Sequence, residues 1–278
     1  MAQRFHRQVV VVTGASSGIG RSTAHAFARE GARVVLGARR KDQLEEAAAS
    51  MRHGGREARA VPCNVVVPQQ LARLVHAATE RWNRLDVLVA NAGIGLTAEI
   101  AETQRDDLRY VLDVNVVGVF NTIQAGLPFM IAQGHGTIVI VSSVLGYRGI
   151  PRMAGYCATK AALNALSEGL RTELKPKGIN VLLACPGLTA TEFSDRRLGG
   201  RQPKVVGKWM SADDVGVAIV NAVHSGRKRL VLTPGGKLLA AVSRHAPWLA
   251  DRMIERWHRN EEAQVAQESA AARSAPAT

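Results

Sequence analysis

A tyrosine and a lysine four residues apart, Tyr156 and Lys160, are well suited to proton transfer. They fall in a stretch of helical period, where positions i and i+4 lie on one face, so the ammonium can stabilise a phenolate. An ordinary tyrosine has a pKa of about 10, and a neighbouring positive charge would bring that pKa towards neutrality, as a general acid/base requires. An exposed helical pair would show the same spacing, so the assignment depends on other motifs.

A glycine-rich segment at residues 13–20, Thr-Gly-Ala-Ser-Ser-Gly-Ile-Gly, stands between a valine run and a helical pattern. Gly14 permits a tight turn, while Gly18 and Gly20 allow backbone and helix to approach a pyrophosphate at the helix N-terminus. A turn that binds nothing is the alternative. The position directly after the first strand favours a dinucleotide site.

The end of the second expected strand carries two arginines, Arg39 and Arg40. An acidic residue at this place would bind a ribose 2′-hydroxyl, whereas arginine accommodates a 2′-phosphate. The guanidinium fork suits phosphate geometry. The sequence therefore favours NADP, with NAD possible, and the alternative for Arg40 is a solvated side chain at a helix start.

Short β-branched runs alternate with longer segments of helical period, which is typical of a parallel sheet. The expected strands are residues 9–12, 34–36, 57–62, 86–90, 137–141, 179–184 and 229–232. The expected helices lie near residues 24–29, 41–53, 68–82, 106–133, 154–175 and 211–224. The pattern predicts one α/β, doubly wound Rossmann-type domain over residues 1–233, with a parallel seven-stranded sheet whose faces are both covered.

Three segments depart from this rhythm. Residues 188–210, rich in glycine and basic residues, are expected to form a mobile loop. Residues 234–260 are expected to form an amphipathic helical extension, with Pro247 suited to a helix start. Residues 261–278 are polar and rich in small side chains, so a disordered tail is expected.

The extension is expected to carry apolar residues on one side and positive charge beside them: Trp248, Leu249, Met253, Ile254 and Trp257, with Arg252, Arg256 and Arg259. An apolar helix face must be covered. It could pack on the protein's own surface or on a second subunit, dock residues 236–259 on an anionic membrane, or close over the substrate loop.

The bulk composition is that of a globular protein, with 46% hydrophobic and 21% charged residues among 278. A net charge of +13 would attract polyanions, but aromatics make up only 4%, and no nucleic-acid-binding motif is recognisable, so no specific nucleic acid is expected. Cys63, Cys157 and Cys185 have no metal-ligand spacing, so we expect free thiols and no metal. With no long apolar run and no signal-peptide pattern, a cytoplasmic protein is expected, unless the extension associates with a membrane.

Six ordered motifs together resemble the short-chain dehydrogenase/reductase family over residues 9–234. They are the glycine turn, Asn91-Ala92-Gly93, Asn115, Ser143, the Tyr156/Lys160 pair and Pro186-Gly187. The resemblance implies an NAD(P)-dependent oxidoreductase that transfers a hydride between nicotinamide and a carbonyl or secondary alcohol. It also implies a homodimer or homotetramer.

The resemblance implies a catalytic set of Asn115, Ser143, Tyr156 and Lys160. Ser143 lies thirteen residues before Tyr156, the family spacing, and its neighbour Ser142 would face away if both remain on the strand. The family role of Asn115 is to hold the lysine through a water. The alternative is an asparagine that bonds its own helix backbone.

The resemblance also implies a set of cofactor-binding residues. They are Gly14, Ser16, Ser17, Gly18, Ile19, Gly20, Arg39, Arg40, Asn64, Val65, Asn91, Ala92, Gly93, Tyr156, Lys160, Pro186, Gly187, Thr189 and Thr191. The chain departs from the family pattern at Ala90, where a second asparagine is common, and at Asn64, where aspartate is common. The Asn64 amide oxygen can still accept a hydrogen bond from an adenine amino group.

The substrate pocket is expected between residues 93–98, 144–154 and 188–210, whose apolar side chains favour an apolar carbonyl compound. Two other classes of function remain open at this stage. One is a cofactor-sensing regulator that keeps the fold without turnover. The other is a scaffold recruited to nucleic acid or membrane by charge, whose binding would fall with salt.

Overall fold

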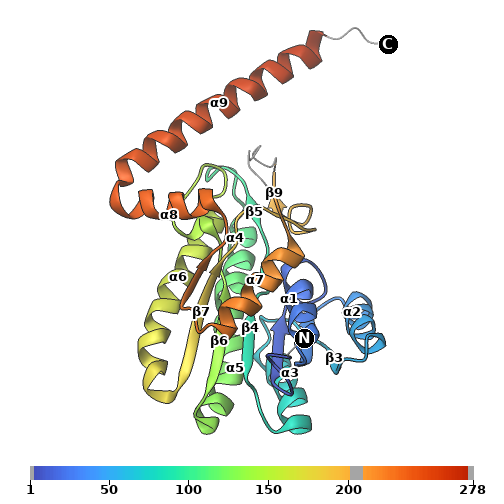
Figure 1. Cartoon of the computed structure of the whole chain (residues 1–278). Coiled ribbons are helices and arrows are strands. Elements are labelled where there is room, and N and C mark those ends of the chain that lie inside the picture. The colour runs from blue at the N-terminus through green and yellow to red at the C-terminus, as the bar shows by residue number, and fades with distance from the viewer. Residues whose placement is uncertain (1–2, 201–208, 275–278) are drawn as a thin grey trace.

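The computed structural model describes residues 3–200 and 209–274, and it contains a seven-stranded parallel sheet in the order β11-β7-β6-β4-β1-β2-β3 (Figure 1). The strands are β1 (Val9–Thr13), β2 (Arg33–Ala38), β3 (Ala58–Pro62), β4 (Val87–Ala90), β6 (Gly136–Val141), β7 (Ile179–Cys185) and β11 (Arg229–Val231). Val10 of β1 pairs with Val34 on one side and with Val87 on the other. The predicted sheet is confirmed.

Six helices cover the two faces of the sheet. One face packs against α1 (Gly18–Arg29), α2 (Lys41–His53) and α7 (Ala212–His224), the other against α3 (Pro68–Trp82), α5 (Gly118–Gln133) and α6 (Ala154–Leu174). Within β1, Val10 and Val12 belong to the first core, and Val9 and Val11 to the second. This alternation explains the continuous apolar runs, because successive side chains enter opposite cores. The doubly wound Rossmann-type architecture is confirmed.

The order of the strands creates a crevice between β1 and β4. The chain proceeds from β1 to β2 and β3 in one direction, then returns to β4 on the other side of β1. Ligands of doubly wound sheets bind at such a switch point, outside the carboxyl ends of the strands. The segments after β1, β4, β6 and β7 therefore meet at one edge.

The long helix expected over residues 106–133 is interrupted. It consists of α4 (Arg105–Leu112), one π-helical turn, η1 (Asp113–Val117), and α5. The turn contains Asn115, whose side chain bonds the backbone of Ile94 on a neighbouring segment. Among the described residues, Arg105–Gln133 is long and apolar enough to span a membrane, but half of its most apolar window is buried within the fold.

The segment expected to be a mobile loop is ordered at both ends. β8 (Thr189–Ala190) pairs with β10 (Met210–Ser211), and β9 (Leu198–Gly199) pairs with β5 (Leu96–Thr97). Residues 201–208 of the predicted loop lie outside the described residues. These short pairings tie the segment to the edge of the crevice.

Two helices follow the sheet. α8 (Pro234–His245) begins where the Thr233 hydroxyl accepts a 3.0 Å hydrogen bond from the Gly236 amide. α9 (Pro247–Ser274) starts at the expected proline and extends away from the sheet (Figure 1). α9 includes residues 261–274, for which a disordered tail was expected, and alanine, glutamine and glutamate are good helix formers. Residues 275–278 lie outside the described part of the chain.

The beginning of α9 is attached to the loop that follows β6. Arg148 forms an ion pair with Asp251 and donates a 3.4 Å hydrogen bond to the carbonyl of Pro247. Arg152 lies 3.9 Å from the buried carboxylate of Glu261. The extension is therefore connected to residues beside the expected substrate pocket.

Candidate active site

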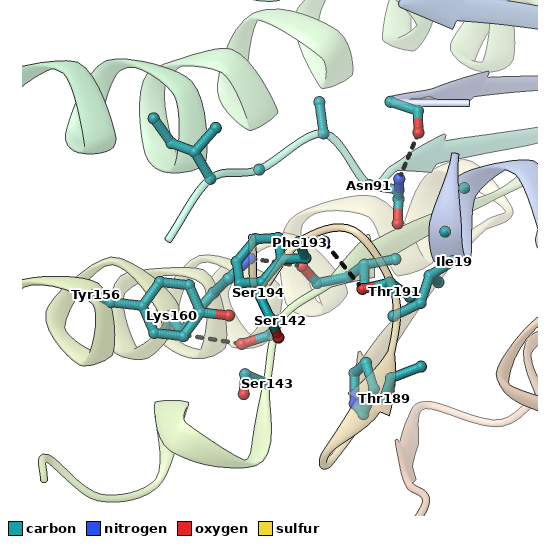
Figure 2. Close-up of a pocket in the computed structure, with 18 of the residues that line it drawn as sticks. Ile19, Asn91, Ser142, Ser143, Tyr156, Lys160, Thr189, Thr191, Phe193 and Ser194 are labelled. Atoms are coloured by element: carbon teal, nitrogen blue, oxygen red, sulfur yellow. Dashed lines mark hydrogen bonds between the residues drawn. The ribbon is translucent and has the colours of Figure 1, made fainter. Parts of the chain in front are cut away.

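A cavity of about 990 Å³ opens at the carboxyl edge of the sheet. Every residue expected at the cofactor or catalytic site lines it, with the exception of Asn115. Figure 2 shows Tyr156, Lys160 and Ser143 on one side of this cavity and Ile19, Asn91 and Thr191 on the other. The crevice and the motifs thus coincide.

The turn after β1 requires glycine, both for its backbone conformation and for its close contacts with neighbouring atoms. Gly14 has a φ of 67°, in the left-handed region. A Cβ on Gly20 would lie 2.3 Å from the carbonyl oxygen of Gly14 and 2.4 Å from the Asn91 amide nitrogen. The Ser17 hydroxyl does not cap the first-turn amides of α1. The free backbone N–H groups at the N-terminus of α1, beside a turn of glycines without side chains, fit a pyrophosphate group.

Asn91 holds this turn in place. Its amide nitrogen donates to the carbonyl oxygens of Thr13, at 3.0 Å, and Gly14, at 3.3 Å. Its backbone N–H donates to the Thr13 hydroxyl at 3.1 Å. The side chain, expected as a cofactor contact, therefore supports the turn through its hydrogen bonds.

The two arginines after β2 differ in their contacts. Arg40 donates to the hydroxyls of Ser16, at 2.9 Å, and Ser17, at 2.7 Å, and forms a 3.1 Å ion pair with Glu192. Arg39 donates to the hydroxyl of Tyr110. Arg40 is thus directed towards the glycine turn instead of solvent.

Asn64 and Val65 follow β3 at the same edge. The Asn64 side-chain oxygen accepts a long, 3.4 Å hydrogen bond from the backbone N–H of Val66, and the backbone N–H of Asn64 donates to the side-chain oxygen of Gln70 at 2.7 Å. An amide oxygen has two lone pairs, so one remains for an adenine amino group.

The segment after β7 covers the glycine turn. Thr191 would lie 3.1 Å from a Cβ placed on Gly18, and Thr189 donates to the Gly187 carbonyl at 3.1 Å. A Cβ on Gly187 would approach the side chain of Thr233 to 2.8 Å. Residues 186–191 therefore enclose the cavity opposite the α1 N-terminus.

The two serines after β6 have different partners. The Ser142 hydroxyl lies within 3.0 Å of the Lys160 carbonyl and 2.8 Å of the Asn164 side chain, so it is engaged with α6. The Ser143 hydroxyl accepts from the Leu145 amide at 3.1 Å and hydrogen-bonds the side chain of Tyr156. This agrees with the choice of Ser143, made from spacing.

The pKa of Tyr156 is shifted in the direction opposite to that expected from its neighbours. Burial raises the pKa of this phenol well above its usual range, and the hydrogen bond from Ser143 and the charge of Arg197 only partly oppose the rise. Burial also lowers the pKa of Lys160 to about 8. The Lys160 Nζ lies 5.7 Å from the Tyr156 ring centre and donates to the Val141 carbonyl at 3.1 Å. The expected lowering overlooked the desolvation of both groups.

Asn115 lies behind the cavity wall. It is fully buried, accepts from the Ile94 amide at 2.8 Å, and donates to the Ile94 carbonyl at 2.9 Å and the Thr159 hydroxyl at 3.1 Å. A Cβ on Gly93 would lie 3.2 Å from its oxygen and 3.6 Å from Lys160 Nζ. Asn115 therefore bonds across to another segment and not to its own helix, close to the lysine.

The sequence did not single out several cavity residues. Phe193 packs against Tyr156 with its ring tilted by 58° and the ring centres 5.8 Å apart, and the Arg197 guanidinium lies 5.8 Å from the Phe193 ring centre. Leu239 of α8 and Tyr110 of α4 also line the cavity. Residues 188–210 were expected to shape the pocket, but no local pattern distinguishes Phe193 or Arg197 within them.

Two relatives show how far the sequence similarity extends. The chain is 34% identical over 260 residues to dehydrogenase/reductase SDR family protein 7-like of Drosophila melanogaster, covering 88% of this chain and 79% of the relative. It is 36% identical over 236 residues to glycine betaine reductase ATRR of Emericella nidulans. That match covers 82% of this chain but only 19% of the longer fungal protein.

Solved structures show the same fold. A short-chain dehydrogenase/reductase from Burkholderia phymatum in complex with NAD has a TM-score of 0.79 at 29% identity, covering 87% of this chain and 93% of that one. An alcohol dehydrogenase from Thermococcus sibiricus complexed with 5-hydroxy-NADP has a TM-score of 0.73 at 30% identity, covering 82% and 96%. The family model for short chain dehydrogenases matches residues 8–200. The chain belongs to the short-chain dehydrogenase family of NAD(P)-binding oxidoreductases.

Proposed function

We propose that the protein is an NADP-preferring oxidoreductase that interconverts an apolar carbonyl compound and the corresponding secondary alcohol. The observation that carries this proposal is the single cavity that joins Ser143, Tyr156 and Lys160 to the glycine turn. Nothing in residues 3–200 and 209–274 favours the regulator or charge-recruited scaffold that the sequence left open.

The glycine turn and its surroundings fit a dinucleotide. The first-turn amides of α1 would hold the pyrophosphate, because they lie at the cavity and the Ser17 hydroxyl does not cap them. Asn64 and Val65 would lie along the adenine, and Thr189 and Thr191 along the nicotinamide half, by the family pattern. When bound, the cofactor supplies or accepts the hydride.

The proton moves at Tyr156. In the reducing direction the phenol hydroxyl gives its proton to the substrate oxygen, and in the oxidising direction the phenolate takes it back. Ser143 Oγ orients the same substrate oxygen and stabilises its developing charge. Lys160 favours the phenolate through its positive charge. Asn115 holds the Ile94 backbone and the Thr159 hydroxyl near the lysine through its hydrogen bonds.

The preference for NADP rests on Arg39 and Arg40. The neighbouring Ser16 and Ser17 hydroxyls, which already accept from Arg40, add hydrogen-bonding groups at the expected phosphate. The solved relatives bind NAD in one case and an NADP analogue in the other, so the preference is a property to be measured on this chain.

The proposal is tested by turnover with both reduced cofactors on a panel of ketones, aldehydes and acyl-chain carbonyl compounds. We expect NADPH-dependent reduction of apolar members of the panel. Tyr156→Phe should lower turnover at least 100-fold and leave the cofactor dissociation constant within about threefold, since general acid/base catalysis contributes roughly 10²–10⁴-fold. Retention of more than about a hundredth of the turnover by this variant would contradict the role of Tyr156.

A further inference from the structure

The substrate end of the cavity contains an arginine that the catalytic chemistry does not use. Arg197 lies on the segment before β9, half-buried, and its stem packs on Gly95, where a Cβ would lie 2.5 Å from the Arg197 Cγ. Its guanidinium lies over the Phe193 ring, which in turn packs at a tilt against Tyr156. The charge is therefore held beside the reacting position by contacts on both of its sides.

This guanidinium is poorly satisfied by the protein. Of its donors, Nη2 alone has a partner among the described residues, the Ser194 hydroxyl at the long distance of 3.5 Å, and Nε is buried without one. The adjacent Arg196, by contrast, forms a 2.8 Å ion pair with Glu192. Burial lowers the pKa of Arg197. The charge of Asp195 opposes this shift only in part, and no described carboxylate forms an ion pair with Arg197. A partly desolvated cation in this situation is stabilised by any anion that reaches it.

Arg197 lies beside a hydrophobic cluster. Leu96, Met153, Tyr156, Phe193 and Leu198 belong to one hydrophobic cluster around the substrate end. Leu145 and Ile150 pack against the same cluster and line the cavity. A ligand that fills this space would present hydrocarbon to the cluster and only one anionic group to Arg197.

We propose that Arg197 binds a carboxylate of the substrate, so that the substrate is an apolar oxo acid whose carbonyl reaches Tyr156. Phe193 contacts both groups, with its ring centre 5.8 Å from the Tyr156 ring centre and 5.8 Å from the Arg197 guanidinium, so a substrate held by both would have several bonds between its carboxylate and its reacting carbonyl. An Arg–carboxylate pair in such a site is bidentate and directional, and it would fix which carbonyl of a substrate is reduced. The inference rests on the proposed reductase function and specifies its substrate class.

The test compares 4-oxo-4-phenylbutanoate with its methyl ester, which differ in the negative charge. With NADPH, the unmodified enzyme should reduce the acid with a kcat/KM at least tenfold above that of the ester. Arg197→Gln should abolish that ratio, mainly by raising KM for the acid, while Arg197→Lys should keep part of it. Arg109→Gln, which removes an equal charge from an exposed site on α4 outside the cavity, should leave the ratio unchanged.

Calorimetric titration of the NADPH-loaded protein with benzoate gives a readout without turnover. Binding that weakens at least tenfold in Arg197→Gln and not in Arg109→Gln would support the carboxylate site. If the ester is reduced as well as the acid, or if Arg197→Gln slows both substrates equally, Arg197 only shapes the pocket and the inference is overturned. Failure to reduce either compound or any neutral ketone, with benzoate still bound through Arg197, would instead count against the reductase function.

Discussion

At the scale of single residues, Lys160 is a cation that the fold buries deeply. The residue is 4% exposed, and its ammonium donates a hydrogen bond to the neutral carbonyl of Val141. Burial lowers its pKa from 10.5 to about 8. The protein therefore retains a charge at neutral pH that destabilises its folded state, as active sites often do.

We predict that Lys160→Met raises the free energy of unfolding of the cofactor-free protein at pH 7 while abolishing turnover. Below pH 8 the lysine is charged in both the folded and the unfolded protein, so the folded state bears the full free-energy cost of burying the charge. Between about pH 8 and 10.5 the folded state has lost the proton and the unfolded state keeps it, so the difference between variant and wild type should shrink. Urea unfolding at several pH values measures this, and a gap that is constant with pH would contradict the shift.

A second prediction at this scale concerns the cofactor. Arg39→Asp should raise the dissociation constant of NADPH at least tenfold, about 1.4 kcal/mol, and leave that of NADH within about threefold, because our proposal assigns the lost charge to the 2′-phosphate. Arg40→Gln should weaken NADPH selectively as well, since Arg40 contacts Ser16 and Ser17.

Fluorescence titration of both cofactors measures these constants. Arg52→Asp is the matched charge control, because Arg52 pairs with Glu45 on α2 outside the cavity. Equal affinity of the unmodified protein for NADPH and NADH would show that the two arginines do not select the cofactor.

At the scale of elements, the glycine turn and α1 are fitted to each other through backbone atoms. Gly20 of α1 faces the Gly14 carbonyl, and Asn91 from the end of β4 completes the contact. No side chain separates the turn from the helix. The position of the α1 N-terminus, and with it the dinucleotide site, therefore depends on a residue without a Cβ.

Gly20→Ala should accordingly lower the free energy of unfolding and weaken binding of both cofactors together. The added Cβ would lie 2.3 Å from a backbone oxygen, which cannot move aside without shifting the turn. Gly169→Ala is the control, because a Cβ at this position of α6 meets no atom within 4 Å and should stabilise the helix by about 0.5–1 kcal/mol. Thermal unfolding with cofactor titration compares them, and unchanged cofactor binding in Gly20→Ala would refute the close fit.

At the scale of the whole molecule, the α8–α9 extension leaves apolar surface uncovered. Trp248 is 61% and Met253 51% exposed, whereas Ala250 on the same helix is buried. The cation of Arg252 stacks on Trp248 at 5.6 Å. One part of α9 thus packs on the protein itself, and the remaining apolar side chains require another partner.

We predict that this partner is a second copy of the chain, which agrees with the oligomers typical of the family. Removal of residues 247–278 should lower the mass measured by light scattering and leave the sheet folded, because both core clusters lie within residues 5–231 apart from the packed Leu232. Trp248→Ala with Met253→Ala should have the same effect. An unchanged mass, together with co-sedimentation of the full chain with anionic vesicles at low salt, would favour membrane docking instead.

The sequence by itself determined the features that short windows encode. The alternating runs predict strands and helices, because a helix must bury one apolar stripe and a central strand of this sheet must bury both faces. The glycines at positions 14, 18 and 20 predict a turn, because other residues would be strained or too large there. The four-residue spacing of Tyr156 and Lys160 places both on one helix face. Each of these inferences depends on neighbours within a few positions.

Tertiary structure alone decided what depends on distant partners. The π-turn at Asn115 accompanies its bonds to Ile94, 21 positions away, and the strand Leu198–Gly199 forms by pairing with Leu96–Thr97. The raised pKa of Tyr156 follows from burial of the phenol. The orientation of Arg40 towards the glycine turn and the position of Arg197 beside Phe193 follow from packing. Burial and long-range contact are properties of the assembled chain, because water is excluded only when segments from different parts of the sequence close around a group.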